Sequence, residues 1–156
     1  MIELRALLEE LGVRLSAESP PFLESDPVQT LLKHGLSIIQ KRHVIRLPRK
    51  VAPKNAKNDA WAELVIDSVS YDFEGQTVRH FELEIELLKS GKTHELNRLV
   101  AALKRLYLDE LRPWPHGKLS TGLAIEALLH DNAMPGLIRA GCLLPAAYEE
   151  IAAILS

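Results

Sequence analysis

The segment FELEIELL, residues 81 to 88, places three glutamates at alternating positions: Glu82, Glu84 and Glu86. Side chains two residues apart on a strand share one face and lie roughly 6 to 7 Å apart. Three carboxylates at that spacing repel one another unless water, cations or basic side chains accompany them. The segment therefore predicts one of two things: a solvent-facing polar surface, or an inner face that holds a divalent metal ion, Mg²⁺ or Mn²⁺.

The same stretch runs into Gly91-Lys92-Thr93, which is how a phosphate-binding P-loop ends. A P-loop also needs a glycine five residues before Gly91, and that position is Glu86. P-loop strands are normally buried parallel strands of continuous apolar sequence, which this alternating segment is not. We therefore reject a nucleotide-binding loop and interpret Gly91 and Thr93 as a turn followed by a helix cap.

Composition narrows the function classes. The 156 residues are 47% hydrophobic, enough for one domain with a core. Lys plus Arg number 19 against 21 Asp plus Glu, so no basic excess indicates a nucleic acid polymer or an anionic membrane. The single cysteine, Cys142, has no partner for a disulfide or a zinc site, and the start MIELRALLEE is not a secretory signal. We expect a soluble cytoplasmic protein that binds neither nucleic acid nor membrane.

The elements that must position the glutamates follow from periodicity. Leucines at helical spacing predict a detached helix and a proline-rich linker over residues 1 to 26, and a short helix follows at 27 to 35. Three segments with β-branched or alternating residues predict strands, and the last two form a hairpin around Glu74-Gly75. The predicted strands are residues 36 to 47, 60 to 73 and 76 to 88.

The rest of the chain predicts mainly helices. A basic polar loop is expected at residues 49 to 59, and a helix at 93 to 108 carries an apolar stripe suited to covering the sheet. A short strand or extended segment is expected near 118 to 123, followed by Ala- and Leu-rich helices to the end. These elements divide the chain into an N-terminal helix and linker (1 to 26), a sheet region (27 to 130) and C-terminal helices (131 to 156).

Neighbouring strands add charges at strand spacing. Glu63 and Asp67 share one face of the second predicted strand, and Arg42 and Arg46 share one face of the first. Such residues fit ordinary cross-strand ion pairs, which contribute little when exposed. They equally fit a sheet face with carboxylates for metal and basic groups for phosphate, and periodicity alone does not separate the two.

The order of these features resembles that of a known family. The segments IQKRHVIRL, AELVIDSVSYDFEGQ and HFELEIELLKSG, then a helix, then HGKLSTGLAIEALL, are similar to the second half of a CYTH domain, the triphosphate tunnel metalloenzyme family. The resemblance spans residues 36 to 129. It implies an α+β fold in which an antiparallel sheet forms half of a tunnel-shaped barrel, covered by helices, with a helical C-terminus.

The resemblance also implies a chemistry. Members of that family hydrolyse or transform triphosphate-containing compounds with a divalent metal, here Mg or Mn as the implied cofactor. A metal-positioned water attacks the terminal phosphoryl group, and the protein supplies orientation and charge. The residues implied are Glu82 and Glu84 as catalytic metal-binding carboxylates, Asp67 as a further metal ligand, and Arg42, Arg46 and Lys118 as phosphate-binding cations.

One family feature has no counterpart. The family's first strand carries Glu-x-Glu-x-Lys, whereas the start of this chain offers Glu3 and Arg5 in a helical pattern. Three explanations stay open: a fragment of a longer chain, a homodimer that completes the barrel from two halves, or a shortened descendant without catalysis. The resulting prediction is a hydrolase of inorganic triphosphate or an organic polyphosphate. The alternative is a non-catalytic module that binds a phosphorylated ligand or a protein.

Other candidates have simpler interpretations. The six histidines are scattered without metal-ligand spacing, so we expect them on the surface or in packing roles. Trp61, Tyr107 and Trp114 are expected to anchor the core, because nothing else points to base stacking. Ser120 lacks the glycine-flanked turn of a nucleophilic serine.

Overall fold

A computed structural model describes residues 27–33, 35–55, 59–108 and 110–156. The chain divides into two compact units, residues 1–39 and 40–156. In the first unit, helix α2 (Pro27–Lys33) confirms the short predicted helix, and Gly35 after it has a φ of 84° that favours glycine. The helix and linker predicted for residues 1 to 26 lie outside the described residues.

Three long strands form the body of the second unit: β1 (Lys41–Val51), β2 (Ala62–Phe73) and β3 (Gln76–Leu87). They pair antiparallel in sequence order, and Gly75, with a φ of 78°, lies in the β2–β3 turn. The first strand begins later than predicted and continues through Val51, into the segment predicted as a loop. It continues because β2 pairs with it up to Ala62, and Trp61 N–H then donates to Val51 C=O at 2.9 Å.

Two short strands complete the sheet, β4 (Ile138–Arg139) and β5 (Cys142–Leu143). The order is β1-β2-β3-β5-β4, and β5 runs parallel to β3 at Arg79 and Cys142. The sheet is therefore mixed: the predicted antiparallel pairing holds for the three long strands, and the parallel pairing of β5 was not predicted. The β4–β5 turn is made by Ala140 and Gly141, both with positive φ, and Ala is not a residue that signals such a turn. Over the described residues the sheet does not close into a barrel.

The helices are α3 (Thr93–Leu106), α4 (Lys118–His130) and α5 (Pro145–Leu155). Helix α3 was predicted, although its N-cap is Lys92 rather than Thr93, and the Lys92 N–H donates to Glu95 Oε2 at 3.1 Å. The strand predicted at residues 118 to 123 was wrong, because that segment is the start of α4. Its inward residues recur at helical spacing, with Thr121, Ile125 and Leu128 buried on one face.

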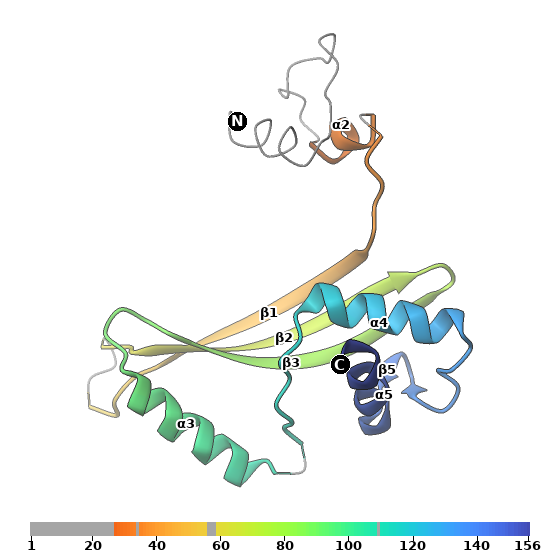
Figure 1. Cartoon of the computed structure of the whole chain (residues 1–156). Helices are drawn as coiled ribbons and strands as arrows, with labels where there is room; N and C mark the ends of the chain where they lie inside the picture. The colour runs from red at the N-terminus through yellow and green to blue at the C-terminus, as the bar shows by residue number, and fades with distance from the viewer. Residues whose placement is uncertain (1–26, 34, 56–58, 109) are drawn as a thin grey trace. The chain divides into compact units, whose positions relative to one another are not determined.

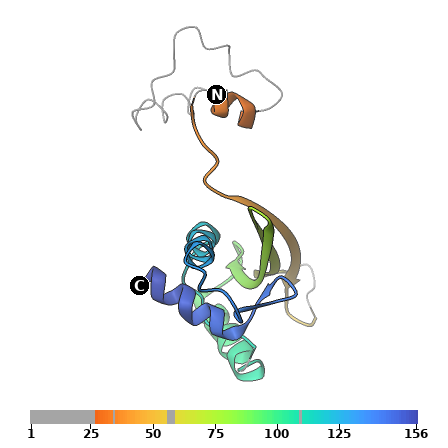
Figure 2. The same ribbon diagram turned by 90° about the vertical axis from the view of Figure 1, so that its right-hand side faces the viewer.

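The long strands curve around the side of the sheet on which α4 and α5 lie (Figure 2). Both helices lie near the β2–β3 turn, whereas α3 is at the other end of the strands (Figure 1). The core joins the covered ends of the strands to α4 and α5. Its buried members are Val69, Tyr71, Val78, Ala124, Ile125, Leu128, Met134, Ala147 and Ile151.

Gly122 lets α4 approach β2 closely. A Cβ at that position would lie 2.6 Å from Cε1 of Tyr71 and 2.2 Å from Nε2 of Gln40. Both distances are far below van der Waals contact, so a larger residue would have to displace the Gln40 side chain and the buried Tyr71 ring, or the helix itself. Within the described parts of the chain, no helix combines the length and apolar character needed to cross a membrane.

Candidate functional site

The register of the sheet aligns charged side chains across all three long strands. Arg46 of β1 lies beside Asp67 of β2, which lies beside Glu82 of β3. Glu84 is two residues further along β3 and therefore shares the face of Glu82. This is the face that α4 and α5 cover further along the strands, because Tyr71 and Val78 belong to the same alternation. Strand alternation thus brings the glutamates to the inner side of the curved sheet.

The carboxylates of Asp67, Glu82 and Glu84 form a tight trio. One oxygen from each lies within 4.8 Å of the others. Asp67 is fully buried, and the side chains of Glu82 and Glu84 are 11% and 32% exposed. Glu86, the third glutamate of the alternating segment, is exposed. A solvent-facing surface therefore describes Glu86 and not the other two.

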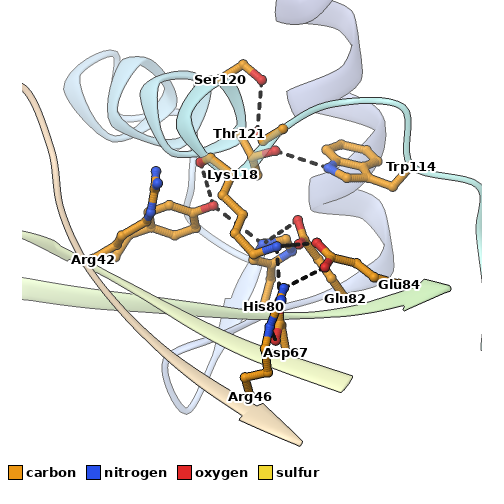
Figure 3. A network of polar contacts seen from close by, with 12 residues as sticks. Arg42, Arg46, Asp67, His80, Glu82, Glu84, Trp114, Lys118, Ser120 and Thr121 are labelled. Carbon is orange, nitrogen blue, oxygen red and sulfur yellow. Dashed lines mark hydrogen bonds and ion pairs between the residues drawn. The ribbon is translucent and has the colours of Figure 1, made fainter. Parts of the chain in front are cut away.

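Lys118 points from the first turn of α4 into the middle of the trio (Figure 3). Its Nζ lies 3.1 Å from Asp67 Oδ2 and 2.6 Å from Glu82 Oε2, and it also donates to Glu84 Oε1. The ammonium therefore occupies a position surrounded by three carboxylates, which is the environment a bound cation would have.

Arg46 closes the cluster from the side of β1. Its Nε and Nη2 donate to the two oxygens of Asp67 at 2.9 and 2.7 Å, and Nη2 also lies 2.6 Å from Glu84 Oε2. Such a two-point contact holds both side chains in a fixed geometry. Because the Arg46 side chain is 46% exposed, it also reaches solvent.

The contacts shift the ionisation of the buried groups. The hydrogen bond from Arg46 lowers the pKa of Asp67, and Lys118 lowers it further, against burial, which acts in the opposite direction. Burial would lower the pKa of Lys118, but its hydrogen bonds to the three carboxylates outweigh burial and raise that pKa. The hydrogen bond to Asp67 raises the pKa of Arg46. With three carboxylates against two cations, the cluster has a formal charge of −1.

His80 touches the cluster and was missed at the sequence level. Its ring is buried, with Nε2 3.4 Å from Glu82 Oε1 and 3.5 Å from the Tyr71 hydroxyl. Among the described residues, Nδ1 of His80 is the buried side-chain atom that has no hydrogen-bond partner. Burial lowers the pKa of His80 to about 4, with a further contribution from the charge of Lys118. Its position two residues before Glu82 places it on the same face of the strand, and this spacing could have indicated its contact with the cluster.

Two hydrogen bonds hold the start of α4 in place. The Tyr71 hydroxyl donates to the Lys118 C=O at 2.7 Å, and Trp114 Nε1 donates to Thr121 Oγ1 at 3.0 Å. The expectation that Trp114 anchors the core is consistent with this contact and with its place beside the core, whereas Tyr107, expected to do the same, is 47% exposed. Together the bonds fix the height of Lys118 above the sheet.

Arg42 stands apart from the other predicted site residues. It lies beside Tyr71 in the register, and its Nη1 donates to Gln40 Oε1 at 2.9 Å. The structure thus brings together Asp67, Glu82, Glu84, Arg46 and Lys118, and leaves Arg42 outside their contacts.

Gly91 has a packing role of its own. A Cβ there would lie 2.2 Å from the Trp61 C=O, so the chain needs glycine for a close backbone approach. This geometry accounts for Gly91 without a phosphate ligand.

The donor set fits a hard divalent cation. Carboxylate oxygens are the ligands that Mg²⁺ and Mn²⁺ prefer, and three converge here. Two basic side chains adjoin them, as a phosphate ligand would require. The molecule is therefore an α+β protein with a mixed acidic and basic cluster on the inner side of a curved sheet. No protein-family model, curated protein or solved structure matches the chain.

Proposed function

We propose that this protein is a CYTH-like, metal-dependent hydrolase of inorganic triphosphate or an organic polyphosphate, whose sheet is half of a tunnel. One observation carries the proposal: Lys118 Nζ contacts the carboxylates of Asp67, Glu82 and Glu84 together, on the inner face of the sheet. Burying a charge network costs desolvation free energy that ion pairing often fails to recover. A network of this kind is therefore better explained by ligand binding than by stability.

Each side chain has a role in this proposal. Asp67, Glu82 and Glu84 would hold Mg²⁺ or Mn²⁺, which supplies neutralising charge and activates water when bound. Lys118 and Arg46 would bind phosphate oxygens, with Arg46 able to contact both carboxylate and ligand because it is partly exposed. Lys118 would then exchange its carboxylate partners for phosphate.

The second candidate is a non-catalytic module that binds a phosphorylated ligand or a protein. The observation that favours it is the mutual satisfaction of the charged groups, since Asp67 already accepts two hydrogen bonds from Arg46 and lies 3.1 Å from Lys118. Because these charged groups already pair with one another, no catalytic metal is required to explain why the cluster exists.

Phosphate release from tripolyphosphate, measured with Mg²⁺, with Mn²⁺ and with a chelator, tests the proposal. We expect metal-dependent release by the wild-type chain and a loss of about 100-fold or more in Glu84→Gln, which keeps the side-chain shape and removes the charge. The matched control is Glu126→Gln on the exposed side of α4, which should retain activity. Equal turnover in Glu84→Gln and wild type would remove the site assignment.

The same proteins separate the two candidates. Calorimetric binding of tripolyphosphate without hydrolysis, lost in Glu84→Gln, would favour the binding module. Absence of both binding and hydrolysis would contradict the hydrolase and the phosphate-binding form of the module, and would leave only a protein-binding module.

A further inference from the structure

Both outer edges of the three long strands are open along much of their length. Over the described residues, β1 pairs only with β2, and β3 pairs beyond β2 only at Arg79, with Cys142. An open edge presents unpaired backbone N–H and C=O groups that another strand can bind. The two edges therefore need a partner or a device that blocks one.

The backbone groups that face outward can be assigned from the hydrogen bonds at the strand ends. Arg79 N–H donates outward to Gly141 C=O at 2.7 Å, and outward groups recur at every second residue of a strand. On β3 the outward groups are therefore those of Phe81, Leu83, Ile85 and Leu87. Tyr148 lines the same cavity as Phe81, the next outward residue after the one paired with β5, so the open part of this edge starts at Leu83.

The same reasoning applies to β1. Val51 C=O accepts from Trp61 on the side of β2, so the odd-numbered residues of β1 bond to β2. The outward groups then belong to the even-numbered residues, from Arg42 to Lys50. Pro48 is one of them, and its missing N–H is lost from the outer edge, where the sheet tolerates it.

The two edges have opposite charges. Strand β1 contains five basic residues and no acidic one, and β3 from residue 81 to 87 contains three glutamates and no basic residue. Pairing β1 with β1, or β3 with β3, would place like charges side by side, which is destabilising. Pairing β1 with β3 would place opposite charges side by side.

Apolar surface accompanies both edges on the other face of the sheet. Ile45 and Leu47 of β1 are 55% and 49% exposed. Beside the β3 edge is a cavity of about 500 Å³, whose lining includes Leu83, Ile85 and, from α3, Val100. The apolar side chains of an added β1 strand could therefore pack against the apolar residues that line this cavity.

We propose that the open edge of β3 binds strand β1 of a second copy of this chain, in parallel orientation. In a parallel pair, a residue whose backbone N–H and C=O point toward the partner strand lies directly opposite a residue whose own N–H and C=O point away from the first strand. Leu83 and Ile85 then adjoin the second copy's Ile45 and Leu47, and Glu84 adjoins its Arg46. In an antiparallel pair, directly facing residues would both point toward each other, which sets apolar against basic side chains.

The pairing goes beyond the proposed hydrolase and does not depend on it. It would extend the inner face of one copy into that of the next. In this register the second copy's Arg46 lies beside Glu84, and its Lys50 lies diagonally across from Glu86, whose direct neighbour is Pro48. Each copy contributes its β1 edge to one neighbour and its β3 edge to another. The contact is therefore heterologous and produces a ring if the rotation between copies closes.

Charge reversal tests the pairing on the full chain, with no metal or phosphate present. Light scattering coupled to size exclusion should give a multiple of the 17.4 kDa chain mass for the wild type. Lys50→Glu and Glu86→Lys should each weaken association roughly five-fold or more, because each creates a like-charge contact. An equimolar mixture of the two variants should associate better than either alone, since each mismatched contact then finds its opposite charge.

Thermal unfolding of each variant checks that the chain still folds. In addition, hydrogen exchange at the amides of Leu83, Ile85 and Leu87 should slow as the wild-type concentration rises. A wild-type chain that stays monomeric at its highest soluble concentration would overturn the proposal. So would a mixture of variants that associates no better than its components.

Discussion

The inner face of the sheet has two halves that the same three strands build in opposite ways. Under α4 and α5, the side chains of Val69, Tyr71 and Val78 are fully buried among apolar neighbours. Two residues before Val69 on β2, Asp67 is equally buried but surrounded by charge. The alternation of inward and outward side chains is the same in both halves. The halves differ in their cover: the body of α4 lies over the first, and only the first turn of α4 reaches the second. Lys118, at the start of α4, marks the boundary between the two halves.

The difference separates stability from chemistry. Apolar burial in the covered half contributes about 25 cal/mol per Å² removed from water. The charged half recovers little net free energy from its ion pairs, because the groups must be desolvated. We therefore expect substitutions in the covered half to change the free energy of unfolding alone, and substitutions in the charged half to change ligand binding in addition to any cost of an unpaired buried charge.

The largest expected effect is that of Ile125→Ala in α4. Ile125 is fully buried, so its truncation leaves a cavity and should lower the free energy of unfolding by about 3 kcal/mol, within the usual range for such changes. Urea denaturation measures it. The neighbouring exposed change Glu126→Ala should stay within about 0.5 kcal/mol. A cost for Ile125→Ala no larger than that of the control would show that this half is not the stabilising one.

Much of the charged half could be predicted from the sequence. Alternation in residues 81 to 88 correctly identified β3 and the shared face of its glutamates, because strand periodicity is local. The partners Asp67 and Arg46 also followed from local alternation. Lys118 came only from the resemblance to a family, since a contact between positions 118 and 84 depends on how α4 crosses the sheet.

Other features were not predictable for physical reasons. The segment from Lys118 was predicted as extended because β-branched and small residues are ambiguous, and only burial against the sheet makes it helical. His80 looked like five other histidines until the register placed it beside Glu82. The parallel pairing of β5 depends on a chain reversal far along the sequence, which no local pattern signals.

His80, which lies between the two halves, should make the free energy of unfolding depend on pH. Burial lowers its folded pKa to about 4 from 6.5, so the folded state resists protonation that the unfolded state accepts. Stability from this group is fully present above pH 6.5 and should fall as the pH decreases from 6.5 toward 4. A shift of that size corresponds to on the order of 3 kcal/mol at its limit.

His80→Phe should flatten the pH dependence in that window while keeping a ring beside Tyr71. The measurement is the free energy of unfolding from pH 4 to 7 in metal-free buffer. Asp67, whose pKa is lowered from 3.8, also loses part of its contribution as the pH falls below about 5, but it is present in both proteins, so its contribution cancels in the comparison. An unchanged slope in His80→Phe would assign the pH dependence to other groups.

The smallest expected effect is the most informative about the charged half. Lys118→Met removes the ammonium from among three carboxylates while keeping most of the unbranched side chain, which is one atom shorter. Mn²⁺ alone should then stabilise the variant more than the wild type, in which the metal must first displace Lys118. At tenfold excess over the dissociation constant the gain is about 1.4 kcal/mol. Thermal unfolding with increasing Mn²⁺ measures it.

Lys118→Arg is the matched control, because it keeps the positive charge and should respond to Mn²⁺ as the wild type does. Tripolyphosphate binding should weaken in Lys118→Met and not in Lys118→Arg, since the lysine would bind phosphate once the metal is present. If Mn²⁺ stabilised the wild type as strongly as Lys118→Met, the ammonium would not occupy the metal position. If Mn²⁺ stabilised neither protein, Asp67, Glu82 and Glu84 would be a structural ion-pair cluster, and the charged half would differ from the covered half only in polarity.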